Sequence, residues 1–111
     1  MNPVDTDIKK IVLRIEKAIH ELVSSHIREK YWVTHYGAID IHPKHLVYWI
    51  CVQSDSEKRR LKGDTVLMRQ LRDVLVVYYY PSSGRDEVYI GFESQETVDR
   101  EAGGNWWNHW K

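Results

Sequence analysis

The sequence predicts an α+β fold, a two-layer α-β-β-α-β sandwich in which two amphipathic helices cover one face of a three-stranded, mainly antiparallel sheet. Two segments repeat apolar residues every three or four positions, the spacing of a helix that buries one face. Three other segments are rich in Val, Ile, Tyr and Trp or alternate apolar with polar residues, which is typical of strands. The length of 111 residues fits a single domain, residues 1–111.

The first amphipathic helix is expected over about residues 5–28. Asp5 or Thr6 is placed to cap its N-terminus. Its apolar stripe must be covered by a sheet or by another helix. The stripe consists of Ile8, Ile11, Val12, Ile15, Ala18, Ile19, Leu22, Val23 and Ile27.

Residues 31–41 and 46–53 are expected to pair as an antiparallel hairpin, because both are rich in strand-forming residues and the connection is short. Pro43 lies in the connection and has no backbone N–H for a central strand. Alternation along the first strand places Trp32 and Tyr36 on the same face.

The second amphipathic segment follows the hairpin. Ser54 and Glu57 have the spacing of a capping box at a helix start. Gly63 interrupts the helical pattern, and Asp64 is able to cap a new start. The segment is therefore either one long helix or a short helix followed by a main helix over about 65–79.

A third strand is expected over residues 87–93, where apolar and polar residues alternate. Ser94 is placed to cap a short helix over 95–102, which Gly103 and Gly104 would end.

The C-terminal segment, residues 105–111, contains three tryptophans and must dock to hide them. It is expected either as a fourth short strand or closing tail within its own chain, or as a tail that docks in a partner. Strand-like alternation would place Trp106 and Trp110 on one side, and Trp107 and His109 on the other.

Composition excludes several classes of protein. Lys plus Arg and Asp plus Glu both total 16, and this zero net charge argues against binding through a bulk basic excess to nucleic acid or to a membrane surface. The longest apolar run, Val74–Tyr80, ends in three tyrosines and is too short for a membrane span. The single cysteine, Cys51, excludes an internal disulfide and favours a cytoplasmic location.

Catalytic motifs are absent from the sequence, and we expect no enzyme activity, no cofactor and no metal. Cys51 lies in the middle of a strand, where a buried, unreactive thiol is expected. A weaker alternative is a metal or catalytic site built from residues around the hairpin, namely His35, Asp40, His42, His45 and Cys51.

The leading hypothesis is a small cytoplasmic protein-interaction domain that binds a protein partner or a second copy of itself. Bacterial immunity and other inhibitor proteins work in this way, which is an analogy of design only. Exposed Trp and Tyr side chains are enriched where proteins bind each other. The candidate partner-binding residues are Trp32, Tyr36, Trp49, Trp106, Trp107 and Trp110, with Glu93, Glu96 and Asp99 as a charged rim.

The alternative hypothesis is a nucleic-acid-binding module. It would bind phosphates through a basic run and stack bases on the exposed aromatic side chains. The basic run consists of Lys58, Arg59, Arg60 and Lys62.

Overall fold

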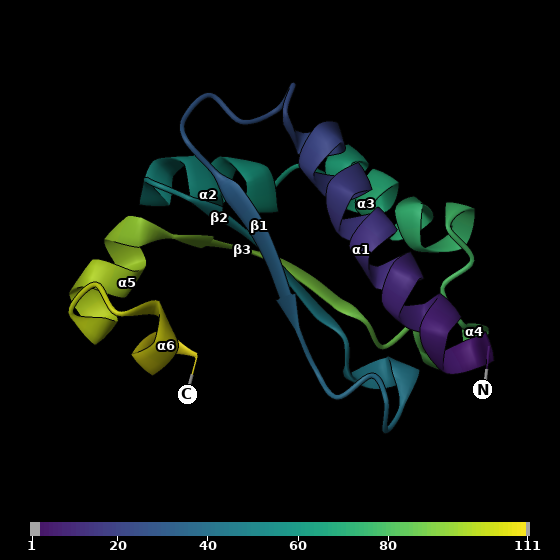
Figure 1. Ribbon diagram of the computed structural model, residues 1–111. Coiled ribbons are helices and arrows are strands. Elements are labelled where there is room, and N and C mark those ends of the chain that lie inside the picture. Colours follow the sequence, from purple (N-terminus) through teal and green to yellow (C-terminus); the bar gives the residue numbers. More distant parts are fainter. Residues whose placement is uncertain (1–2, 111) are drawn as a thin grey trace.

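The computed structural model describes residues 3–110, with side chains from residue 8 onward, and confirms an α+β fold (Figure 1). Its main helices and strands follow the order that the sequence predicts. In chain order they are α1 (Pro3–Val23), β1 (Trp32–Tyr36), the 3₁₀ turn η1 (Pro43–His45), β2 (Val47–Val52), α2 (Asp55–Lys62), α3 (Thr65–Val77), α4 (Ser82–Arg85), β3 (Tyr89–Ser94), α5 (Gln95–Ala102) and α6 (Trp106–His109).

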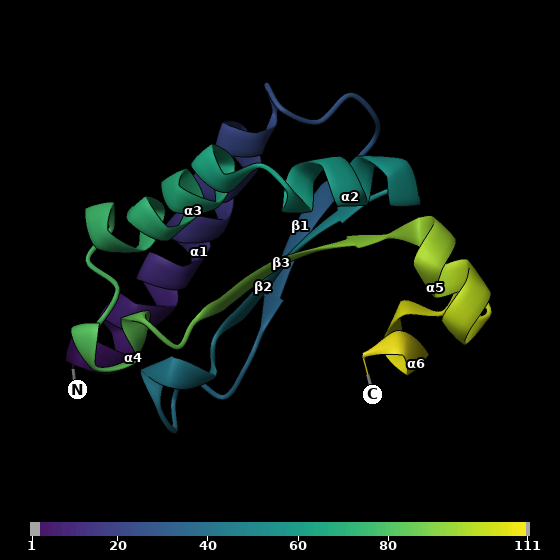
Figure 2. The same cartoon turned by 180° about the vertical axis from the view of Figure 1, so that it is seen from behind.

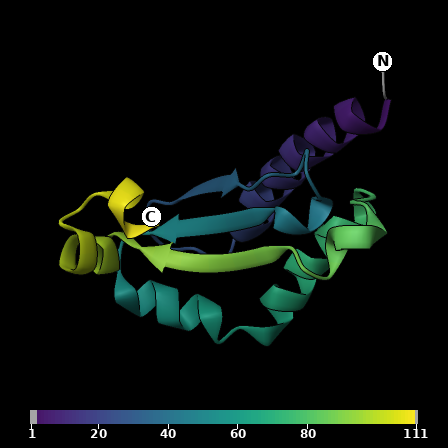
Figure 3. The same cartoon turned by 90° about the horizontal axis from the view of Figure 1, so that it is seen from below.

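The sheet is mixed, with strand order β1-β2-β3. β1 and β2 form the antiparallel hairpin, whereas β2 and β3 run parallel. A parallel pair needs a long crossover connection, and α2 and α3 supply it. Figure 3 shows the three strands side by side, with α2 packed against β3. The expectation of a mainly antiparallel sheet is therefore corrected to one antiparallel and one parallel pair.

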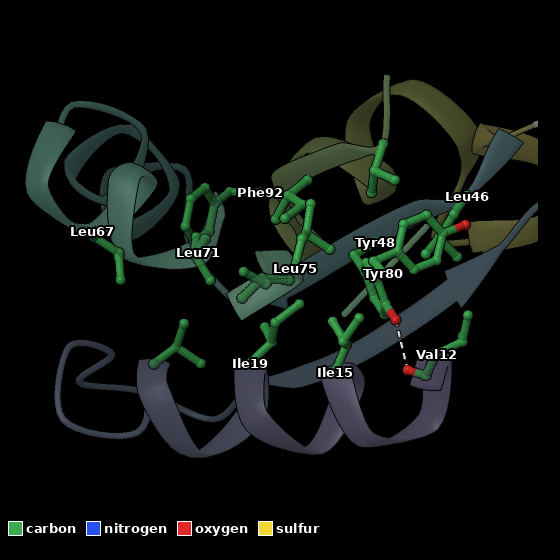
Figure 4. Close-up of a cluster of buried hydrophobic side chains, with 14 of the residues drawn as sticks. Val12, Ile15, Ile19, Leu46, Tyr48, Leu67, Leu71, Leu75, Tyr80 and Phe92 are labelled. Atoms are coloured by element: carbon green, nitrogen blue, oxygen red, sulfur yellow. Dashed lines mark hydrogen bonds between the residues drawn. The ribbon is translucent and has the colours of Figure 1, made fainter. Parts of the chain in front are cut away.

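The hydrophobic core lies between the sheet and the layer formed by α1 and α3. Ile15 and Ile19 of α1, together with Leu71 of α3, are fully buried there (Figure 4). The sheet contributes Tyr48, whose hydroxyl donates to the Val12 carbonyl at 2.6 Å. Seen from behind, α1 and α3 lie together, with α5 and α6 at the far end of the sheet (Figure 2). Two helices thus cover one sheet face, as the periodicity predicts.

Two elements end about five residues earlier than expected. α1 stops at Val23, although Ile27 is still buried beyond it. β1 stops at Tyr36, because Gly37 has φ +130° and leaves no room for a side chain: a Cβ there would lie 2.0 Å from the His45 carbonyl oxygen. α1 begins at Pro3, so the predicted caps Asp5 and Thr6 lie within its first turn and not at its N-cap position.

The second amphipathic segment is two helices, with a break at Gly63. The Asp64 side chain caps α3 by accepting from the Leu67 amide at 3.0 Å. Ser54 caps α2 by accepting from the Glu57 amide at 3.1 Å. The capping box is only half formed, since the Glu57 carboxylate accepts from the Arg28 amide at 2.7 Å instead.

The tail is a single helical turn and not a strand. The Asn105 side chain caps α6 by accepting from the Asn108 amide at 3.1 Å. The four-residue spacing of a helix keeps Trp106 and Trp110 on one side. His109 also faces the sheet, which corrects the expectation that it shares a side with the exposed Trp107.

Among the described residues, no helix combines the length and the apolarity that crossing a membrane requires.

Candidate interaction surface

The sheet face opposite α1 and α3 is called here the aromatic face. The pairing register arranges nine side-chain positions on it in three rows that run across the strands. The rows are Trp32, Cys51 and Glu93; Thr34, Trp49 and Gly91; and Tyr36, Val47 and Tyr89.

Trp49 lies at the centre of the aromatic face and contacts three other rings. Its indole stacks on Trp110 with ring centroids 5.7 Å apart, and it lies tilted against Tyr89 at 5.2 Å. Its Nε1 donates to the Tyr36 hydroxyl at 3.1 Å. Tyr36 and Tyr89 remain 44% and 51% exposed, so solvent reaches both flanks of this aromatic cluster.

Gly91 allows two of these rings to meet. A Cβ on Gly91 would lie 2.5 Å from Cε1 of Tyr89 and 2.9 Å from Cζ3 of Trp49. The Tyr89 ring therefore lies across the bare backbone of its own strand and against Trp49. Such packing of an aromatic side chain over a strand glycine compensates for the missing side chain.

α6 covers the first row of the aromatic face with the protein's own side chains. Trp106 packs edge-on against Trp32, with centroids 4.9 Å apart, and its Nε1 donates to Gln95 Oε1 at 2.8 Å. Trp110 packs on Trp49, and the indole N–H of Trp110 is buried without a hydrogen-bond partner. The tail thus docks within its own chain, and of its three tryptophans only Trp107, 73% exposed, points away.

Glu93 lies buried beneath α6 and not on a solvent-exposed rim. Its Oε1 accepts from Lys58 Nζ at 2.6 Å and from the Ser94 amide at 2.9 Å, and its Oε2 lies 2.8 Å from His109 Nε2. Burial raises the pKa of Glu93, but these hydrogen bonds outweigh it and hold the pKa below the ordinary carboxyl value. Glu93 therefore holds α2, β3 and α6 together.

The other two predicted rim residues, Glu96 and Asp99, are exposed on α5. The Glu96 carboxylate accepts a hydrogen bond from the Asp55 amide at 2.8 Å, yet its side chain remains at the surface. Glu101, on the same helix, is 57% exposed and lies 3.7 Å from the ring of His109. The exposed carboxylates of α5, Glu96, Asp99 and Glu101, are called the acidic edge; Glu96 and Asp99 share one side of the helix, and Glu101 lies on the side of His109.

The cation of this helix is already paired. Arg100 donates to Asp55 at 2.8 Å, and it also interacts electrostatically with Glu96 and Glu101. The hydroxyls of Ser94 and Thr97 also donate to Asp55, and these bonds hold the pKa of Asp55 far below its usual range.

The basic run is divided between internal pairs and solvent. Lys58 is bound to Glu93, and Arg60 donates to Glu57 at 2.7 Å. Arg59 and Lys62 are exposed. Two of the four predicted phosphate ligands are thus committed to carboxylates within the fold.

The predicted cysteine and histidine candidates do not converge. Burial raises the pKa of Cys51 to about 12, which keeps its sulfur protonated and unreactive. His35 bonds to Glu16 of α1 on the opposite sheet face, away from His42 and His45. No three His, Cys, Asp or Glu side chains of the described part of the chain gather as metal ligands.

Sequence reasoning missed Tyr89, Gly91 and His109 as parts of this surface. Tyr89 and Gly91 could have been found from the sequence, since alternation places both on one strand face and so puts an aromatic ring beside a glycine. The pairing of His109 with Glu93 has no comparable signal, because it depends on the path of the tail.

No protein-family model matches the chain, and no curated protein or solved structure matches it either. A functional assignment therefore depends on the residues of this surface.

Proposed function

We propose that the chain is a small, non-catalytic interaction domain that binds a protein partner through its aromatic face and tail. The observation that carries this proposal is the half-open aromatic cluster, in which Tyr36 and Tyr89 are 44% and 51% exposed on either side of the stacked Trp49 and Trp110. Tyr and Trp bring a large contact area at a small cost in side-chain entropy, and they dominate binding energy at protein interfaces.

The chemistry of the partner follows from the acidic edge. The exposed carboxylates of Glu96, Asp99 and Glu101 lie on the helix that leads into the tail, and the Trp107 ring of that tail is 73% exposed. Complementary charge speeds encounter and selects among partners. The expected partner is a protein whose surface combines basic side chains with apolar ones.

The rigidity of the surface also supports binding. Trp49 is fixed by contacts to Trp110, Tyr89 and Tyr36, and the tail is fixed by the hydrogen bond between His109 and Glu93. A surface whose side chains are already ordered loses little entropy on binding. This is the design of inhibitor proteins, and the cytoplasmic immunity-like role suggested by the sequence remains an analogy.

Affinity capture with matched variants tests the proposal. The tagged chain is incubated with untreated and with nuclease-treated lysate, and bound proteins are quantified for wild type, Tyr89→Ala, Trp107→Ala and Tyr79→Ala. Tyr79 is 82% exposed on the opposite side of the molecule, so its variant controls for the loss of an exposed ring. We expect one basic protein to bind wild type and Tyr79→Ala, and to bind the other two variants at least tenfold more weakly.

Three outcomes would contradict this function. A protein captured equally by all four chains would not use the aromatic face. Capture that disappears with nuclease treatment and falls steeply with salt would favour nucleic-acid binding. A dimer of wild type that light scattering detects, and that Tyr89→Ala abolishes, would make a second copy the occupant of the face.

A further inference from the structure

The three consecutive tyrosines at the end of α3 have three different environments. Tyr80 is fully buried, and its hydroxyl donates to the Pro43 carbonyl. Tyr78 is half-buried beside α1, and Tyr79 is 82% exposed. Folding therefore buries the side chain of Tyr80 and part of that of Tyr78, but it leaves the ring of Tyr79 in solvent.

Tyr79 occupies a backbone position that favours glycine. Its φ is +59°, in the left-handed region. The Tyr80 amide donates to the Leu75 carbonyl at 2.9 Å and the Tyr79 amide to the Val76 carbonyl at 3.1 Å, which together form a Schellman motif with Tyr79 as its left-handed residue. A bulky side chain is strained in this conformation, and such strain is found at functional positions.

A hollow opens directly beside this ring, between the end of α3 and α1. It measures about 340 Å³ and is lined by Lys10, Ile11, Arg14, Tyr78 and Tyr79.

A second hollow, of about 270 Å³, continues from the first along α1. Arg14 and Tyr78 line both hollows, Lys17 extends the cationic row, and Glu21 contributes one carboxylate to the second hollow. Lys10, Arg14 and Lys17 are four and three residues apart, so one helix face carries all three. Among the described side chains, none of these cations has a carboxylate partner.

We infer that the hollow between α1 and α3 is a nucleotide site, in which Lys10, Arg14 and Lys17 bind phosphate groups and the Tyr79 ring stacks on the base. Ammonium and guanidinium groups are the usual side-chain ligands of phosphate, and an exposed aromatic ring stacks on any base. The volume is that of a small-ligand site. The site lies across the core from the aromatic face and does not depend on the proposed protein partner.

The cationic row is long enough for more than one phosphate group. An α-helix rises 1.5 Å per residue, so Lys10 and Lys17 are separated by roughly 10 Å along α1. This length fits the phosphates of a nucleoside triphosphate or those of two successive nucleotides of a single strand. The shared chemistry is a phosphate chain that carries a base.

Calorimetric titration of the full chain tests the site with adenosine triphosphate, adenosine, inorganic tripolyphosphate and a single-stranded tetradeoxyadenylate. We expect adenosine and tripolyphosphate each to bind at least tenfold more weakly than the triphosphate, because each offers only one of the two contacts. If the tetranucleotide binds more tightly than the triphosphate, the site is supported and its ligand is a nucleic-acid strand. If the triphosphate binds more tightly, the site is supported and its ligand is a free nucleotide.

Two variants and a control separate binding from folding. Tyr79→Gly relieves the strained backbone, so it should raise the melting temperature by a few degrees while it weakens binding about tenfold or more. Arg14→Gln should weaken binding similarly, whereas Arg69→Gln, at an exposed cation of α3 that lines neither hollow, should leave it unchanged. Equal affinity for triphosphate and tripolyphosphate, wild-type affinity of Tyr79→Gly, or no heat with any probe at millimolar concentration would overturn the inference.

Discussion

Replacement of Glu93 by glutamine tests the interaction that fixes the tail. Glu93→Gln keeps the shape of the side chain but removes the charge that accepts from Lys58 at 2.6 Å and lies 2.8 Å from His109. Removing one member of a fully buried ion pair costs about 3–5 kcal/mol. The Lys58 side chain is 19% exposed, so water compensates in part and we expect a loss of about 2 kcal/mol.

Urea unfolding at pH 7, followed by circular dichroism and tryptophan fluorescence, measures this loss. With an unfolding entropy of about 2.1 cal/mol/K per residue, 2 kcal/mol corresponds to a decrease in melting temperature of about 9 °C for a chain of this length. Glu87→Gln, at an exposed carboxylate just before β3, is the matched control and should change stability by less than about 0.5 kcal/mol. Equal stabilities of the two variants would refute the structural role of Glu93.

The pH dependence gives a second readout. The pKa of Glu93 is lowered in the folded state, so its carboxylate stabilises the fold above the ordinary value of 4.5, and this contribution disappears as the pH falls towards the folded pKa. Wild type should therefore lose stability below about pH 4.5 more steeply than Glu93→Gln. Parallel curves for the two proteins would contradict the assignment.

Three further predictions concern packing and reactivity. Gly91→Ala should displace the Tyr89 ring from Trp49 and lower binding through the aromatic face, measured by the capture assay, whereas Gly63→Ala meets only ordinary contacts and should bind as wild type does. Ile19→Ala, at a fully buried position, should cost about 2–4 kcal/mol in urea unfolding, and a cost below 1 kcal/mol would contradict its place in the core. Cys51 should react with a thiol reagent at pH 8 only after unfolding, and rapid reaction of the folded chain would show that the tail does not seal it.

The elements of this fold are largely readable from the sequence because their signals are local. The apolar stripe of α1, the break at Gly63, and the caps at Ser54, Asp64 and Ser94 each involve neighbours within one or two helical turns. Alternation also places Trp32, Tyr36 and Trp49 on one face correctly, because the faces of a strand follow from its period of two.

The features that were not predicted depend on contacts between distant segments. The direction of β3 follows from the crossover through α2 and α3, and no residue of the strand itself encodes it. Alternation assigns Glu93 to the aromatic face but gives no information on which segment covers Glu93 there. The tail contains a cap signal, Asn105, whose importance becomes clear only when Trp106 and Trp110 are seen side by side on the sheet.

The parallel pairing of β2 with β3 affects how the chain reaches its native state. The hairpin closes over a short connection, but β3 can join β2 only after residues 53–88 have been brought into a closed loop, which slows the step. A two-stranded hairpin alone is barely stable in water. Until β3 pairs with β2, the backbone N–H and C=O groups on one edge of β2, residues Trp49–Val52, are unpaired, and strands of other chains are able to bind to this apolar edge. Refolding yield should therefore decrease as protein concentration rises, even though the finished domain shields that edge.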